Sequence, residues 1–132
     1  MPSNVTISAD KLNRLIGTPN CPSLIDVRTD GEWAAAPLLI PGSVRRPRGG
    51  TLAWAAELAG SPAIVICESG AAAGQGVAAM LRHADVAAEV LEGGFTEWRR
   101  AGLPLVTAAR LPPPDREEGR NKATLEELQL PS

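Results

Sequence analysis

The sequence has few aromatic residues, few cysteines and a single histidine. Its 132 residues include three Trp, one Phe, no Tyr, two Cys and one His. With so few rings, the core has to be packed mainly from aliphatic side chains. The two cysteines, Cys21 and Cys67, form neither a Cys-x-x-Cys pair nor a Cys/His cluster, which argues against a zinc site and a disulfide framework. We therefore expect reduced thiols, and neither a metal nor a cofactor.

A basic excess and long apolar runs are also missing. The formal net charge is -2 at pH 7, whereas proteins that bind nucleic acid nonspecifically usually carry a basic excess. No run of about 18 apolar residues is present, so we expect no membrane span. The first seven residues lack the basic region of an export signal. These absences predict a cytoplasmic protein that binds neither nucleic acid nor membranes.

Short apolar runs alternate with helical patterns along most of the chain. Ser8, Asp30 and Thr51 are the expected N-caps of three helices, because each precedes a segment with helical spacing. Such alternation of strands and helices predicts an α/β fold with a mainly parallel sheet. The expected strands include residues 23–27, 64–67 and 88–91, and the later helices are expected at residues 75–84 and 95–101.

The end of the chain differs in composition. Residues 1–106 are expected to form one domain, since a chain of this length can bury a single core but not two. Residues 107–132 contain a run of three prolines and a charged stretch almost free of apolar residues. Such a composition predicts a flexible tail. Its last leucines make a protein partner the candidate ligand of the tail.

The chain is organised around Cys67, which ends a β-branched run and precedes a loop of small residues and a helical pattern. A thiol at the end of a buried strand faces the amides that open the next helix, where a thiolate or an anion is stabilised. The loop amides would form a cradle for a charged sulfur or an oxyanion, and Gly70 and Gly74 would permit positive φ angles. From position alone, an inert buried cysteine is an equally good interpretation. The expected cradle residues are Glu68, Ser69, Gly70, Ala71, Ala72 and Ala73.

Two other features of the sequence carry groups that could form a site. Arg45, Arg46 and Arg48 form a local cationic cluster that is a candidate anion patch, although a solvated surface patch is the favoured interpretation. His83 is expected at the surface near a helix end, because nothing in the sequence places it near Cys67.

Several ordered motifs resemble those of the rhodanese-like (sulfurtransferase) family over residues 7 to about 106. Each motif is weak alone, but their order and spacing together are specific. Residues 24–28 with Glu32 and Trp33 are similar to the family's first strand, D-V-R element and E-[YFW] partner, and residues 40–43 are similar to its I-P-G-A turn. Residues 65–70 are similar to the start of its C-x-x-G loop. Residues 91–95 with Trp98, and residues 102–104, are similar to its closing G-G-x-x-x-W and G-L/Y-P elements.

This resemblance implies a fold, a mechanism and the roles of some residues. The implied fold is a three-layer α/β/α domain with a central, mainly parallel five-stranded sheet. By likeness to the family, Cys67 would take sulfane sulfur from thiosulfate or a similar donor. It would carry this sulfur as a persulfide and pass it to cyanide or a protein thiol. Asp26 and Arg28 would be structural ties near the site.

The loop departs from the family pattern at one position that matters chemically. Family members that use thiosulfate commonly read C-x-x-G-x-R-[SA], whereas Ala72 stands here at the arginine position. Losing the guanidinium removes a bidentate anion clamp, and Glu68 adds a negative charge beside the thiol. We therefore expect weak activity on thiosulfate.

Two alternatives follow from the same residues. Because alanine stands at the arginine position, residue 72, one alternative is a non-catalytic rhodanese module that binds an oxyanion or a protein partner. A dual-specificity phosphatase or arsenate reductase would need an arginine at position 73, which is alanine, so this reading is disfavoured. The chain also resembles rhodanese domains that precede chromate-resistance domains, although none of its residues indicates a response to chromate.

Overall fold

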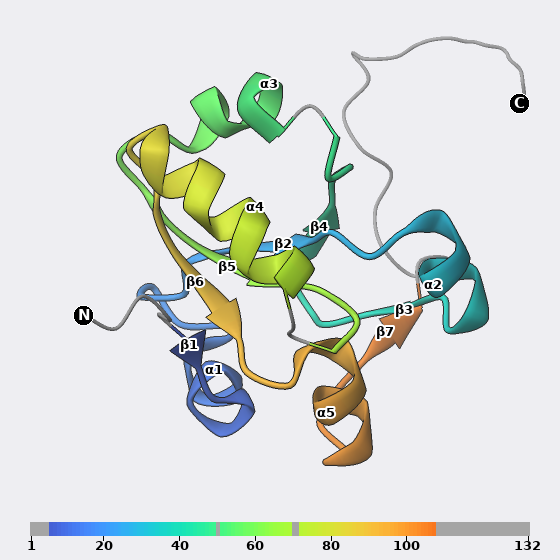
Figure 1. Cartoon of the computed structure of the whole chain (residues 1–132). Helices are drawn as coiled ribbons and strands as arrows, with labels where there is room; N and C mark the ends of the chain where they lie inside the picture. Colours follow the sequence, from blue (N-terminus) through green and yellow to red (C-terminus); the bar gives the residue numbers. More distant parts are fainter. Residues whose placement is uncertain (1–5, 50, 70–71, 108–132) are drawn as a thin grey trace, which may run out of the picture.

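Five parallel strands form the centre of the domain (Figure 1). The structure is a computed structural model that describes residues 6–49, 51–69 and 72–107. The expected mainly parallel five-stranded sheet is confirmed, with the strand order β1-β6-β5-β2-β4. β5 therefore lies in the middle of the sheet, and its carboxyl end is next to that of β2. The strands are β1 (Thr6–Ile7), β2 (Ser23–Asp26), β4 (Ser43–Arg45), β5 (Pro62–Ile66) and β6 (Ala87–Leu91).

Helices cover both faces of this sheet (Figure 1). α3 (Thr51–Ala55), a 3-10 helix (Ala56–Leu58) and α4 (Ala72–His83) lie on one face, and α1 (Ala9–Leu15) and α5 (Gly94–Arg100) on the other. Successive side chains of a strand point to opposite faces, so β5 contributes to both cores. Two buried clusters result, one that includes Val65, Val77 and Leu81, and one that includes Ile64, Phe95 and Trp98.

A second, smaller ribbon lies beside the main sheet. β3 (Leu38–Leu39) pairs antiparallel with β7 (Val106–Thr107), and α2 (Asp30–Ala35) precedes β3. This ribbon brings the end of the described chain back against the segment that follows β2. Thr107, expected as the first residue of the flexible tail, belongs to β7, and residues 108–132 lie outside the described residues. No helix in the ranges that the structure describes has the length and apolarity of a membrane span.

Two of the expected helix starts need correction, whereas the Ser8 cap of α1 is present. Asp30 was expected to cap α2, but Thr29 is the N-cap. The Oγ1 of Thr29 accepts a hydrogen bond from the Glu32 amide at 3.1 Å, and the Glu32 carboxylate accepts one from the Thr29 amide at 2.9 Å. This reciprocal capping box satisfies two amides that an Asp30 cap would leave without partners. Thr51, also expected as a cap, is the first residue of α3.

One ion pair is buried at the carboxyl end of β2. Asp26 and Arg28 are 1% and 2% exposed, and their side chains are joined at 2.8 Å between Nη2 and Oδ2. The guanidinium also donates to the carbonyl oxygens of Ala36 at 3.1 Å and Leu38 at 2.6 Å. Its carbon lies 3.7 Å from the centroid of the Phe95 ring. Arg28 thus ties β2 to β3 and to α5.

We predict that Asp26→Asn lowers the free energy of unfolding by about 3–5 kcal/mol, because it leaves the buried Arg28 charge without its counterion. Urea unfolding followed by circular dichroism measures this loss. Asp10→Asn is the matched control, because Asp10 pairs with Arg14 on the exposed surface of α1. Its effect should be far smaller. If both variants lost the same free energy of unfolding, burial of the Asp26–Arg28 pair would not determine how much the pair contributes to stability.

Candidate active site

Cys67 lies directly after β5, at the carboxyl edge of the central sheet. Its side chain is 2% exposed and packs in the buried cluster that includes Val65 and Val77. The backbone of the loop is held by the start of α5. The carbonyl oxygen of Cys67 accepts a hydrogen bond from the Phe95 amide at 2.8 Å, and that of Glu68 accepts one from the Thr96 amide at 2.9 Å. The position of the thiol is therefore fixed by two elements far apart in sequence.

Gly74, in the first turn of α4, lies against the sulfur of Cys67. A Cβ added at Gly74 would be 2.9 Å from Sγ of Cys67 and 3.1 Å from Cγ1 of Val90. Real Cβ atoms essentially never approach a neighbour as closely as the first of these distances. The sequence suggested that Gly74 supplies a positive φ angle, but it is not among the described glycines that adopt one. Its contribution is the absence of a side chain.

The close approach of Gly74 places the N-terminal end of α4 beside the thiol. The first four amides of a helix have no partner within the helix, and the helix dipole adds partial positive charge at this end. α4 spans 12 residues, enough for a developed dipole. A thiolate or a persulfide anion at Cys67 therefore lies where the helix stabilises negative charge.

The remaining residues of the expected cradle differ in their surroundings. Glu68 is half-buried, and its Oε1 is buried without a hydrogen-bond partner among the described residues. Ser69 is exposed. Ala72 and Ala73 are exposed at the start of α4, which begins three residues before the expected Gln75. Gly70 and Ala71 lie outside the described residues.

Asp26 and Arg28 stand one strand away from the thiol. Within the described residues, the Arg28 guanidinium contacts Asp26, carbonyl oxygens and aromatic rings. With 2% of its surface exposed, Arg28 offers almost no area to a ligand. The structure therefore uses this residue to hold elements together.

The three clustered arginines each pair with a carboxylate. Arg45 lies 3.3 Å from Asp30, Arg46 2.7 Å from Glu57, and Arg48 3.2 Å from Glu32. The cluster is therefore largely neutralised, which the sequence did not indicate because the acidic partners lie in other elements.

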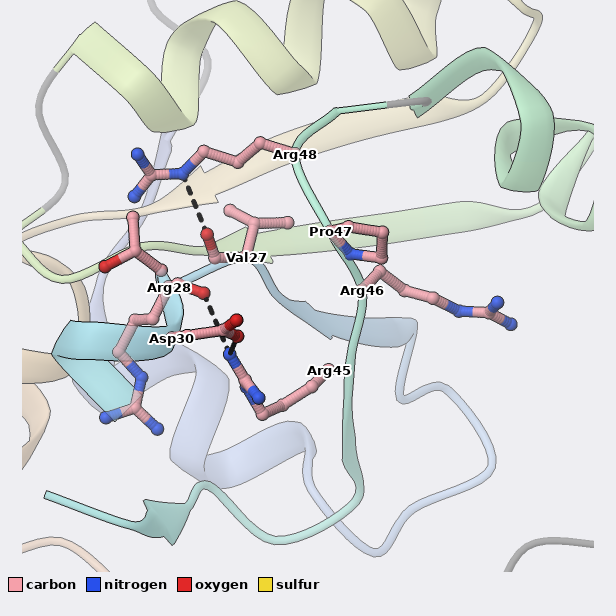
Figure 2. A pocket seen from close by; sticks show the side chains of 8 residues that line it. Val27, Arg28, Asp30, Arg45, Arg46, Pro47 and Arg48 are labelled. Atoms are coloured by element: carbon pink, nitrogen blue, oxygen red, sulfur yellow. Dashed lines mark hydrogen bonds and ion pairs between the residues drawn. The ribbon is translucent and has the colours of Figure 1, made fainter. Parts of the chain in front are cut away.

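These arginines also border a pocket. Residues 27–30 and 45–48 enclose a volume of about 320 Å³ (Figure 2). All three side chains are half-buried rather than freely solvated. Figure 2 shows Arg45 directed at Asp30, Arg48 extending across Val27, and Arg46 leaving in the opposite direction from Arg48. We call this space the arginine pocket.

Sequence reasoning missed the contact between Gly74 and Cys67 and the anchoring of Arg48. The Nε of Arg48 donates to the carbonyl oxygen of Val27 at 2.8 Å. No local signal marks this bond, because any residue at position 27 has the same carbonyl. His83 is exposed at the last position of α4, far along the helix from Gly74. Within the described ranges, no group of three or more His, Cys, Asp or Glu side chains has the arrangement of a metal site.

Comparisons with known proteins agree with this architecture. The model of the rhodanese-like domain family matches residues 8–101. No curated protein matches the chain at a significant level.

Among solved structures, the chain is similar to a rhodanese-related protein from Thermoplasma volcanium, with 23% identity, a TM-score of 0.66 and coverage of 77% of this chain and 97% of that one. A rhodanese-like domain protein from Staphylococcus aureus has 23% identity, a TM-score of 0.62 and coverage of 71% and 90%. A thiosulfate sulfurtransferase from Pseudomonas aeruginosa has 24% identity and a TM-score of 0.68, with coverage of 83% of this chain and 21% of that one. At these identities the likeness establishes the fold. Together with the match of the family model over most of the chain, it shows that the protein belongs to the rhodanese-like domain family.

Proposed function

We propose that the protein is a sulfurtransferase that carries sulfane sulfur as a persulfide on Cys67. The observation that carries this proposal is the contact of Sγ with the first turn of α4, where Gly74 has no side chain. A nucleophilic cysteine needs stabilisation of its anionic form. A side chain at position 74 would press on Sγ, and glycine avoids this crowding.

The reaction has two balanced steps with thiosulfate as donor. The Cys67 thiolate attacks the outer sulfur of thiosulfate, the sulfur–sulfur bond of the donor breaks, and sulfite leaves with the electron pair. Cys67 then carries a persulfide anion. Cyanide or a protein thiolate attacks the terminal sulfur, which leaves as thiocyanate or as the acceptor's persulfide and restores the Cys67 thiolate. No oxidant or reductant is consumed, and the α4 amides stabilise the negative charge at each stage.

Ala72 limits how strongly this loop binds an anionic donor. Its exposed methyl group cannot replace the guanidinium found in family members that use thiosulfate. Glu68, which follows Cys67 in the chain and is half-buried, adds a negative charge near the thiol. The loop alone therefore favours slow turnover of thiosulfate or a donor of lower charge.

A non-catalytic module is the alternative that one observation favours. Cys67 is 2% exposed, so a donor must enter past the residues that cover it. In such a module the α4 N-terminus would bind an oxyanion or a partner's acidic group without covalent chemistry. The two functions differ in whether Cys67 is chemically required.

We predict that incubation with thiosulfate or polysulfide adds the mass of one sulfur atom to Cys67. Intact-protein mass spectrometry measures the adduct, and thiocyanate release after cyanide addition measures its transfer. Cys67→Ser should abolish both, because a hydroxyl at this position is not a thiolate nucleophile. Cys21→Ser is the control, since Cys21 lies in the loop before β2, and it should retain both. An unmodified parent protein with every donor would favour the non-catalytic module.

We predict that Gly74→Ala reduces persulfide formation, because its Cβ would occupy space beside Sγ. Overpacking of this kind should also lower the free energy of unfolding by about 1–3 kcal/mol. Gly76→Ala is the matched control in the same helix, since nothing lies within 4 Å of a Cβ at Gly76. That variant should keep its activity and unfold at the same or a slightly higher temperature. Equal persulfide yields in both variants would remove the assigned role of Gly74.

We predict that Ala72→Arg raises the rate of thiosulfate turnover, because it restores a bidentate donor to anionic oxygens. The exposed position tolerates a long side chain. Steady-state thiocyanate formation measures the effect, and Ala72→Gln, which adds length without charge, is the control. An unchanged rate in Ala72→Arg would indicate that the site is built for a different donor or binds its anion elsewhere.

A further inference from the structure

The arginine pocket lies at the end of β2, next to the strand that leads into Cys67, and has no part in the chemistry proposed above. Val27, which forms one wall of it, continues β2 beside the end of β5. Its amide donates to the carbonyl oxygen of Ile66 at 2.8 Å. Parallel strands lie about 4.8 Å apart, and Val27 packs in the same buried cluster as Cys67. The pocket and the thiol therefore lie on neighbouring strand ends.

Of the three arginines, Arg48 is the one whose side chain crosses Val27. It lies in the segment between β4 and α3, and its Nε is held by the carbonyl oxygen of Val27 at 2.8 Å. Figure 2 shows its side chain lying across Val27, whereas Arg46 points away from it. A third of the Arg48 side chain remains exposed, so solvent and small ions reach it.

The carboxylate of Glu32 is shared between Arg48 and the Thr29 amide, and its bond to Arg48 is the longer one. Nη2 of Arg48 lies 3.2 Å from Oε1 of Glu32, at the long end of the hydrogen-bond range and longer than a typical charge-assisted bond. The same Oε1 accepts the Thr29 amide at 2.9 Å in the capping box. Glu32 is also a third exposed. An incoming oxyanion therefore competes with Glu32 for Arg48 at little structural cost.

The other charges around the pocket set its balance. Arg45 is oriented by the carbonyl oxygen of Arg28 and by Asp30, and it lies over the ring of Trp33. Arg45, Arg46 and Arg48 each lie against a carboxylate, so the pocket is close to neutral. Displacing Glu32 from Arg48 would leave a cationic site for one anionic group.

We propose that Arg48 is a specificity-determining residue that binds the anionic end of a sulfur donor, and that Glu32 competes with this anion. The inference rests on the proposed sulfurtransferase function of Cys67. The donor class is a sulfane-sulfur compound that ends in an oxyanion such as a sulfonate, because a guanidinium holds two such oxygens in parallel. The covalent step is unchanged, and Arg48 takes no part in it.

The test measures thiosulfate binding in the Cys67→Ser background, where no sulfur transfer takes place. Isothermal titration calorimetry gives the Kd. Arg48→Ala should raise the Kd about tenfold, the loss expected for one charged hydrogen-bonded contact, and Arg48→Lys should recover part of it. Glu32→Gln should lower the Kd, because it removes the competing charge while glutamine keeps the capping box. Arg46→Ala, which removes a charge that points away, should have a much smaller effect.

The two directions of change separate an anion site from a structural tie. A purely structural role of the Arg48–Glu32 pair predicts weaker binding or lower stability in both variants, and urea unfolding monitors the stability. A Kd that is unchanged in Arg48→Ala, or a parent that does not bind thiosulfate, overturns the inference. Failure of the proposed function has a different signature, since Cys67 in the unmutated protein would then gain no sulfur while the Kd differences remain.

Discussion

The buried guanidinium of Arg28 holds several elements together at the carboxyl edge of the central sheet. It is ion-paired with Asp26 of β2, bonded to the carbonyl oxygens of Ala36 and Leu38, and stacked on the ring of Phe95. The Phe95 amide in turn holds the carbonyl oxygen of Cys67. One fully satisfied buried cation thus connects the central sheet, the β3 ribbon and α5. A buried charge requires such complete pairing, because its desolvation is otherwise costly.

Positive charge at the same edge has two sources, backbone amides and arginine side chains. The loop after Cys67 contains no arginine in its described part, and the α4 N-terminus supplies partial charge through backbone amides. Formal positive charge comes instead from the end of β4 and the segment that follows it, where Arg45, Arg46 and Arg48 each pair with a carboxylate from another element. The electrostatics of this edge therefore depend on arginine–carboxylate pairs as well as on the loop itself.

Much of the sheet could be predicted from local patterns. Residues 23–27, 64–67 and 88–91 were expected as strands, and the observed β2, β5 and β6 overlap them closely. β5 is buried on both faces and is a nearly continuous apolar run, whereas β2 and β6 each include one acidic residue, Asp26 and Glu89. β1, β3 and β7 have two residues each, too few to carry a periodic signal. The sequence predicts that α4 starts at Gln75, three residues after its observed start at Ala72. Small residues before Val77 contribute little to the hydrophobic pattern on which that prediction depends.

Local competition explains the helix cap that was predicted wrongly. Thr29 and Asp30 are both good N-cap residues, and propensity alone does not choose between them. The choice depends on the reciprocal bonds between Thr29 and Glu32. Those bonds also hold the carboxylate that meets Arg48, so the helix cap and the arginine pocket share one side chain.

The sequence by itself determined that Cys67 stands between a β-branched run and a loop of small residues, that alanine occupies position 72, and that Arg45, Arg46 and Arg48 lie within four positions of the chain. Only the tertiary structure decided that Gly74 touches Sγ, that Arg28 is sealed beneath Phe95, and that Arg48 reaches across Val27. The physical reason is the range of the interactions. Strand and helix patterns depend on neighbours along the chain, whereas these contacts depend on how α4, α5 and the segment after β4 pack against the carboxyl edge of the sheet.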